Sequence, residues 1–153
     1  MDYSDSIEIS VSSQVAFVAI SDLPAMGRRS PENTGGQWMN ATGPGAGAKF
    51  RGTNARGDSA WSTTARVTTF DPPTQFVFEV TYRGLRVSRW EFVVEQTISG
   101  CRVTEKWKDR RNYFMRRSSD GDGFDRVQFT KTSIRATLEA LKKELEDTGA
   151  QSL

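Results

Sequence analysis

The 153-residue sequence contains no histidine and a single cysteine, Cys101. The absence of histidine excludes Ser-His-Asp and Cys-His catalysis and any metal site with imidazole ligands. A lone cysteine excludes an internal disulfide bond and is typical of proteins in a reducing compartment. The absences therefore exclude several common enzyme classes and favour a cytoplasmic protein.

The sequence also lacks a long apolar run and a large net charge. No segment approaches the roughly 20 apolar residues that cross a bilayer, and we expect no signal peptide after Met1. The 21 Lys and Arg residues nearly balance the 19 Asp and Glu residues, which gives no support for a nucleic-acid partner. We expect no cofactor, no metal ion and no nucleic acid, and both a monomer and a homodimer remain open.

The longest regular pattern is an amphipathic helix over residues 125–147. Its apolar residues are spaced by 7, 4, 3 and 4 positions, which places them on one helical face: Val127, Ile134, Leu138, Leu141 and Leu145. Asp125 is a plausible N-cap, and Gly149 lies just past the expected end. The apolar face of this helix requires a large partner surface.

Residues 49–109 alternate between apolar and polar positions in five runs separated by short turns. They predict an antiparallel meander with strands over 49–55, 60–70, 75–82, 86–96 and 101–107. An earlier strand is expected over 6–11, followed by two short helical pieces, the first of which would bury Val15, Val18 and Ala19. The predicted class is α+β: one domain over residues 1–149, in which a curved antiparallel sheet wraps around one long C-terminal helix, with a frayed tail over 150–153.

Several local segments support a family resemblance: Ser21-Asp22, Ser30-Pro31-Glu32, Gly36-Gln37-Trp38, Gly47–Gly52, Trp61–Thr64 and Arg102–Trp107. With the order of elements, they resemble a bacterial branch of the START-like superfamily (SRPBCC, Bet v 1-like), which includes polyketide cyclase/dehydrase-type and lipid-transfer proteins. The resemblance implies a helix-grip fold with a deep apolar cavity for lipids, sterols or polyketides. The branch usually has Trp where this chain has Arg29, so we expect a more polar cavity lip there.

Strand phase places eight large aromatic residues on the inward face of the meander: Phe50, Trp61, Phe76, Phe78, Tyr82, Trp90, Phe92 and Trp107. They either pack a solid core or line a cavity, and their area exceeds what one helix face requires. We therefore interpret them in part as a cavity wall. The candidate ligand-binding residues are Phe50, Asn54, Trp61, Thr63, Phe78, Tyr82, Trp90, Phe92, Glu105 and Trp107.

Glu105 shares the inward face of its strand with Val103 and Trp107. A buried carboxylate without a partner is costly and tends to hold its proton. Three roles are open: an internal ion pair with a basic residue such as Arg89, a polar anchor for a ligand, or a general acid/base acting with Tyr82 or Arg89. Glu105 is the only candidate catalytic residue, and the anchor role is favoured over catalysis.

Residues 106–117, KWKDRRNYFMRR, combine six basic residues with four large apolar ones. We expect a solvated loop over the cavity mouth with its aromatic residues turned inward. A surface for anionic membranes is the first alternative and single-stranded nucleic acid the second, although no RNA-binding signature is present.

The sequence thus predicts binding or transport of a hydrophobic small molecule, with non-catalytic binding favoured over catalysis. The open alternatives are a cyclase/dehydratase-type enzyme that uses Glu105 and a module that docks on anionic membranes through residues 106–117.

Overall fold

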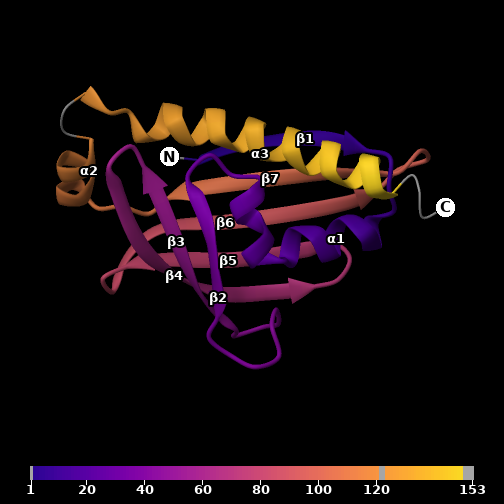
Figure 1. The fold of residues 1–153 in the computed structure, drawn as a ribbon, viewed down its shortest axis with the longest axis horizontal. Coiled ribbons are helices and arrows are strands. Elements are labelled where there is room, and N and C mark those ends of the chain that lie inside the picture. The colour runs from indigo at the N-terminus through magenta and orange to yellow at the C-terminus, as the bar shows by residue number, and fades with distance from the viewer. Residues whose placement is uncertain (1, 121–122, 150–153) are drawn as a thin grey trace.

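The computed structural model describes residues 2–120 and 123–149. Within these residues, seven strands form one curved antiparallel sheet in the order β1-β7-β6-β5-β4-β3-β2, and the long helix α3 lies across it (Figure 1). The strands are β1 (Asp2–Ile9), β2 (Asn33–Trp38), β3 (Lys49–Arg56), β4 (Ser59–Asp71), β5 (Gln75–Tyr82), β6 (Leu85–Gln96) and β7 (Cys101–Asp109). The helices are α1 (Ser13–Ser21), the 3-10 helix η1 (Leu23–Arg28), α2 (Tyr113–Ser119) and α3 (Arg126–Gly149). The predicted α+β helix-grip architecture is confirmed.

Alternation of side chains sets which face of the sheet turns toward α3. Along β7, Cys101, Val103, Glu105 and Trp107 are buried, whereas the residues between them are exposed or half-buried. The neighbouring strand β6 brings Trp90 opposite Trp107, with ring centroids 6.3 Å apart. Breaks in register leave an extra residue in β4, at Thr68, and in β6, at Val87, and add local bends to the sheet. The result is a concave inner face and a polar outer face.

Helix α3 begins as the sequence predicts, because the Asp125 carboxylate accepts a hydrogen bond from the backbone N–H of Gln128 at 3.0 Å. The predicted face packs on the sheet: Val127 is half-buried, and the four deeper residues are buried, namely Ile134, Leu138, Leu141 and Leu145. One boundary was wrong, since the helix includes Gly149. The tail predicted over 150–153 lies outside the described residues.

Helix α1 begins after Ser12, whose hydroxyl accepts a hydrogen bond from the Val15 N–H at 3.2 Å. The predicted buried side was wrong for two residues, since Val15 and Val18 are 43% and 70% exposed, while Ala19 is half-buried. The helix instead turns Phe17 to the sheet, where its ring lies 5.4 Å from that of Phe70. The larger aromatic area of Phe17 decides the orientation.

Residues 106–117 are not one irregular loop. Lys106–Asp109 complete β7, and Tyr113–Ser119 form α2, which begins where Asn112 accepts a hydrogen bond from the Met115 N–H at 2.9 Å. Helix α2 lies at the end of the molecule where α3 begins (Figure 1). Among the described residues, no helix is both long and apolar enough to cross a membrane.

Candidate ligand-binding cavity

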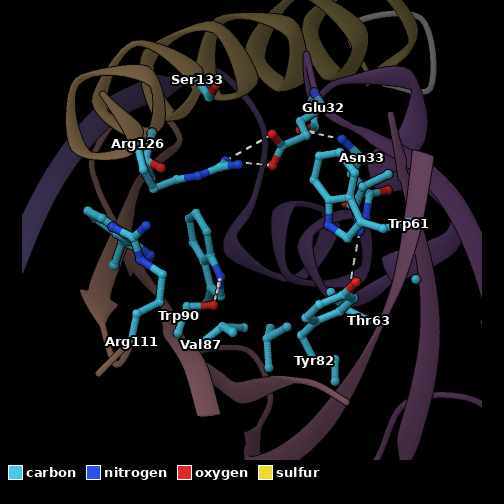
Figure 2. A pocket seen from close by; sticks show the side chains of 18 of the residues that line it. Glu32, Asn33, Trp61, Thr63, Tyr82, Val87, Trp90, Arg111, Arg126 and Ser133 are labelled. Atoms are coloured by element: carbon cyan, nitrogen blue, oxygen red, sulfur yellow. Dashed lines mark hydrogen bonds and ion pairs between the residues drawn. The ribbon is translucent and has the colours of Figure 1, made fainter. Parts of the chain in front are cut away.

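A cavity of about 980 Å³ lies between the concave face of the sheet, helix α3 and the short helices. Its volume is at the upper end of the range for small-molecule sites in proteins. Figure 2 shows Trp61, Tyr82 and Trp90 on the sheet side, with Ser133 and Arg126 on the helix side. The fold therefore does not pack all of the inward aromatic residues into a solid core.

All ten candidate ligand-binding residues line this cavity: Phe50, Asn54, Trp61, Thr63, Phe78, Tyr82, Trp90, Phe92, Glu105 and Trp107. One aromatic residue of the predicted inward face behaves differently. Phe76 is fully buried against Phe17 and Phe70 and belongs to the solid core at the α1 end. The inward face thus divides into a packed part beneath α1 and an open part beneath the first half of α3.

Glu105 is the buried acidic group of the cavity wall, with 4% of its surface exposed. Its Oε2 atom has no hydrogen-bond partner among the described residues. Burial, together with the negative charge of Asp5 directly across on β1, raises the pKa of Glu105 to about 8. At neutral pH the carboxyl is therefore mainly protonated and can donate a hydrogen bond into the cavity.

The ion pair between Glu105 and Arg89, one of the three roles that the sequence left open, does not form. The Nη1 atom of Arg89 donates a hydrogen bond to Oε1 of Glu91 at 3.0 Å. Arg89 alternates with the cavity-lining residues Ser88 and Trp90 and lies on the outer face of the sheet. No bulge turns its side chain inward, so Arg89 is neither a partner for Glu105 nor a second acid/base group.

Helix α3 contributes a row of hydroxyl groups that sequence reasoning missed. Thr130, Ser133 and Thr137 line the cavity beside the apolar residue Ile134. Their spacing of three and four residues was the available signal, because it places them on one side of a helix. Together with the neutral carboxyl of Glu105, they give a largely apolar cavity several hydrogen-bonding groups.

The mouth of the cavity is formed by the β3–β4 and β5–β6 hairpins, α2 and the start of α3. The aromatic residues of α2 do not fold inward as predicted: Tyr113 is 67% exposed and Phe114 78% exposed. Phe114 and the half-buried Met115 still contribute to the lining at the mouth. Leu85, at the tip of the β5–β6 hairpin, is another exposed apolar residue there.

A charged cluster lines the cavity near its mouth. Nη1 of Arg126, the first residue of α3, donates to both carboxylate oxygens of Glu32 at 2.8 and 2.9 Å (Figure 2). The guanidinium of Arg56 covers the ring of Phe124 at 3.5 Å from its centroid, and its Nη1 lies 3.9 Å from Glu32. The cluster holds two cations and one anion.

A second ion-pair network fixes the chain between β7 and α2. Arg111 is buried and donates to both carboxylate oxygens of Asp109, at 3.0 and 2.8 Å, and to Asp120 at 3.0 Å. Burial alone would raise the pKa of Asp109, but the hydrogen bonds and charge of Arg111 outweigh it and lower that pKa. This network holds α2 beside the cavity mouth.

Arg29 does not make the cavity lip more polar, as the sequence had suggested. It is buried outside the cavity, where its Nε donates to Glu144 of α3 at 2.7 Å and its Nη1 donates to the Ala19 carbonyl oxygen at 3.0 Å. Hydrogen bonds from Arg29 and then Arg28 outweigh burial and lower the pKa of Glu144 to about 2. Arg29 therefore ties η1 to the helix.

Within residues 2–120 and 123–149, no group of three or more His, Cys, Asp or Glu side chains is arranged to hold a metal ion. The fold and the cavity define the class: a helix-grip protein with an internal, mainly aromatic cavity. Residues 1–146 match the family model described as polyketide cyclase / dehydrase and lipid transport, and the chain belongs to this family. Membership supports a function in ligand binding or polyketide chemistry.

Solved structures share the fold. The polyketide-cyclase-like protein Cgl2372 from Corynebacterium glutamicum is 26% identical, with a TM-score of 0.61 over 95% of this chain and 91% of that one. Protein NE0264 from Nitrosomonas europaea is 10% identical, with a TM-score of 0.72 over 98% and 97%. The di-domain ARO/CYC StfQ of the steffimycin biosynthetic pathway is 13% identical, with a TM-score of 0.77 over 97% of this chain and 51% of that protein. No curated protein matches the sequence.

Proposed function

We propose that this protein binds and carries a hydrophobic small molecule of the lipid, sterol or polyketide type in the cavity beneath α3. The observation that carries the proposal is the space of about 980 Å³ with aromatic walls and a buried carboxyl whose Oε2 has no hydrogen-bond partner among the described residues. Transfer of apolar ligand surface from water into such a space gains roughly 25 cal/mol per Å². The family description, which combines polyketide cyclases with lipid transport, supports this ligand class.

Glu105 orients the ligand in this proposal. Because its pKa is raised to about 8, the carboxyl is protonated at neutral pH and donates a hydrogen bond to a ligand carbonyl or hydroxyl oxygen. Thr63 and Asn54 of the sheet and Thr137 of α3 offer further hydrogen bonds along the same cavity. The aromatic walls supply affinity, and these polar groups select the orientation.

A fluorescence titration with phenylnaphthylamine, an uncharged aromatic probe, tests the cavity. Thr63 lines the cavity, whereas the exposed Thr53 lies on the outer face of the neighbouring strand. Thr63→Trp fills part of the space and is expected to weaken binding at least tenfold, a loss of about 1.4 kcal/mol. Thr53→Trp is the matched control and should bind as the unmodified protein does. Equal binding by both variants would refute a cavity site.

The same carboxyl favours a second reading as an enzyme, because a protonated acid facing an apolar cavity suits cyclisation or dehydration. Glu105→Gln separates the two. A carrier should lose only part of its affinity, whereas an enzyme should lose turnover by a factor of about 100 or more. The measurement is mass spectrometry of the compound extracted with the purified protein, before and after incubation with it. Loss of one water, abolished by Glu105→Gln, would establish catalysis and contradict simple carriage.

The exposed side chains of the mouth favour a further role: docking on anionic membranes. Leu85, Tyr113 and Phe114 are all more than half exposed at the mouth. Arg83 and Arg117 lie in the same two segments, and neither forms an ion pair within the described residues. Exposed apolar tips flanked by cations suit the interface of an anionic bilayer, where the rings enter the headgroup region.

Sedimentation with vesicles tests this role. We expect binding to phosphatidylcholine vesicles that contain phosphatidylglycerol, and loss of binding between about 0.1 M and about 1 M salt as the charges are screened. Tyr113→Ser with Phe114→Ser should abolish binding, whereas Val18→Ser, an exposed apolar residue on α1, should not. Equal binding to vesicles of phosphatidylcholine alone would contradict the anionic surface.

Charge variants complete the vesicle experiment. Arg83→Gln with Arg117→Gln removes two cations near the mouth and should weaken binding. Lys49→Gln with Arg66→Gln removes two exposed cations at the opposite end of the β3–β4 ladder and should leave binding unchanged. If both pairs weaken binding equally, the attraction comes from the net charge of the protein. Binding to an oligonucleotide in preference to the vesicles would assign the surface to nucleic acid.

A further inference from the structure

The charges that line the cavity are unequal. Within residues 2–120 and 123–149, four arginines and two acidic residues contribute to the lining: Arg56, Arg83, Arg111 and Arg126 against Glu32 and Glu105. Arg111 is neutralised by Asp109 and Asp120, and Glu105 holds its proton at neutral pH because burial and Asp5 raise its pKa. Among the described residues of the lining, Glu32 is therefore the carboxylate that lies against both Arg126 and Arg56.

Glu32 forms its hydrogen bonds with Arg126, one of these two cations. Both of its oxygens accept hydrogen bonds from Arg126, at 2.8 and 2.9 Å. Arg56 lies 3.9 Å from the same carboxylate, which is beyond hydrogen-bond distance. The Nη1 atom of Arg56 is shielded from solvent and has no hydrogen-bond partner among the described residues. Two positive charges thus remain without a balancing carboxylate among the described residues: the exposed Arg83 at the mouth and Arg56 on the cavity wall.

The Arg56 guanidinium lies against an aromatic ring while 35% of the side chain remains exposed. Its carbon atom lies 3.5 Å from the centroid of the Phe124 ring, and the Arg126 guanidinium lies 5.0 Å from the same centroid. A guanidinium stacked on an aromatic face directs its donors outward in its own plane, which suits a planar or tetrahedral oxyanion. A buried donor without an acceptor costs stability. Because Nη1 is covered, a ligand oxygen would approach the guanidinium from the part of the side chain that remains exposed.

We propose that the cavity takes an amphipathic anion, with its apolar body among the aromatic walls and a carboxylate, sulfonate or phosphate group held by Arg56 beside the Glu32–Arg126 pair. This inference rests on the proposed function, because it specifies the ligand class of the same cavity. The anionic group lies near the mouth, where it keeps partial contact with water, since 35% of the Arg56 side chain is exposed. The uncharged far end of the ligand meets Glu105.

Two probes with the same aromatic skeleton test the proposal: anilinonaphthalene sulfonate, which is an anion, and phenylnaphthylamine, which lacks the sulfonate. We expect the anion to bind about tenfold more tightly, which corresponds to about 1.4 kcal/mol. Arg56→Gln should remove most of this preference and leave the dissociation constant of phenylnaphthylamine within about twofold. Arg51→Gln is the matched control, because Arg51 lies exposed on the outer face of the same strand.

A second variant, with the opposite expected effect on affinity, distinguishes the proposed contact from a general structural disturbance. Glu32→Gln removes the balancing anion and should tighten binding of the sulfonate probe, whereas Arg56→Gln weakens it. Thermal unfolding of each variant identifies any that fails to fold, and the other then decides the result. Weaker binding of the anion in both variants would overturn the proposal.

The remaining outcomes distinguish failure of the hydrophobic cavity from failure of the anion site. If neither probe binds the unmodified protein, the hydrophobic cavity itself is refuted. If phenylnaphthylamine binds but the sulfonate binds no more tightly, the anion site is refuted and the cavity stands. A similar loss of sulfonate binding in Arg51→Gln would assign the attraction to net charge and overturn the specific role of Arg56.

Discussion

The pH dependence of stability should report the buried carboxyl of Glu105. In the folded protein its pKa is about 8, compared with 4.5 for the ordinary group, because burial and the Asp5 charge disfavour ionisation. Between these two values the folded chain holds a proton that the unfolded chain has released. The free energy of unfolding contributed by this group is therefore highest below about pH 4.5 and is lost as the pH rises toward 8.

The size of the effect follows from the same two values. Each unit of pKa difference corresponds to about 1.4 kcal/mol, so the difference of roughly 3.5 units gives a total on the order of 5 kcal/mol. Glu105→Gln keeps the shape of the side chain and removes its ionisation. The unfolding free energy of the variant minus that of the unmodified protein should rise by up to about 1.4 kcal/mol per pH unit between about pH 5.5 and 7.5, and level off above about pH 8.

Urea unfolding followed by tryptophan fluorescence, repeated between about pH 5 and about pH 8, measures this difference. The other carboxyls with shifted values do not interfere, because the pKa values of Glu91, Asp109, Glu144 and Glu146 are lowered and their contributions change at more acidic pH. Parallel stability curves for the two proteins over the whole interval would refute the reasoning. They would mean that Glu105 is ionised and paired in the folded state.

Two further predictions concern packing. Arg29→Ala should lower the unfolding free energy by about 2 kcal/mol. This is less than the roughly 3–5 kcal/mol expected for a fully buried ion pair, because Glu144 keeps 29% of its side chain exposed. A change below about 0.5 kcal/mol in urea unfolding would show that η1 is held by other contacts. Phe76→Ala should cost about 3–5 kcal/mol, because the ring is fully buried in the core. Trp61→Ala, on the half-buried cavity wall, should cost less stability and should weaken binding of phenylnaphthylamine. The opposite ranking in unfolding and titration experiments would contradict the division between core and cavity.

Much of the fold could be read from local patterns. The strand over Gln75–Tyr82 has the predicted bounds, and the other five predicted strands appear within a few residues of theirs. The N-cap at Asp125 and the apolar face of α3 were also predicted correctly. The buried side of α1 could not be predicted in this way, because a nine-residue helix has apolar residues on several sides. The aromatic core beneath it decides which side faces inward.

The same division applies to the candidate site. Period-two alternation identified the wall residues from Phe50 to Trp107, because side chains of a strand must point to alternate faces of the sheet. The hydroxyl groups of Thr130, Ser133 and Thr137 on α3 were not predicted as cavity residues, because only the apolar positions of this helix were used in the prediction. The outward orientation of Arg89 follows from the regular alternation of β6 from Ser88 onward, because the extra residue of this strand lies before it at Val87; the sequence left that point open.

The sequence by itself determined the strands, the long helix and the residues that share one face of each element, because these depend on local periodicity. Only the tertiary structure decided which groups meet across the chain. Glu32 and Arg126 are 94 residues apart, and Arg29 and Glu144 are 115 apart, yet each pair is in direct contact. Such contacts depend on the curvature of the whole sheet and the position of α3. That same curvature leaves the inner face partly unfilled, so it creates the cavity, in whose wall Oε2 of Glu105 has no hydrogen-bond partner within the part of the chain that the structure describes.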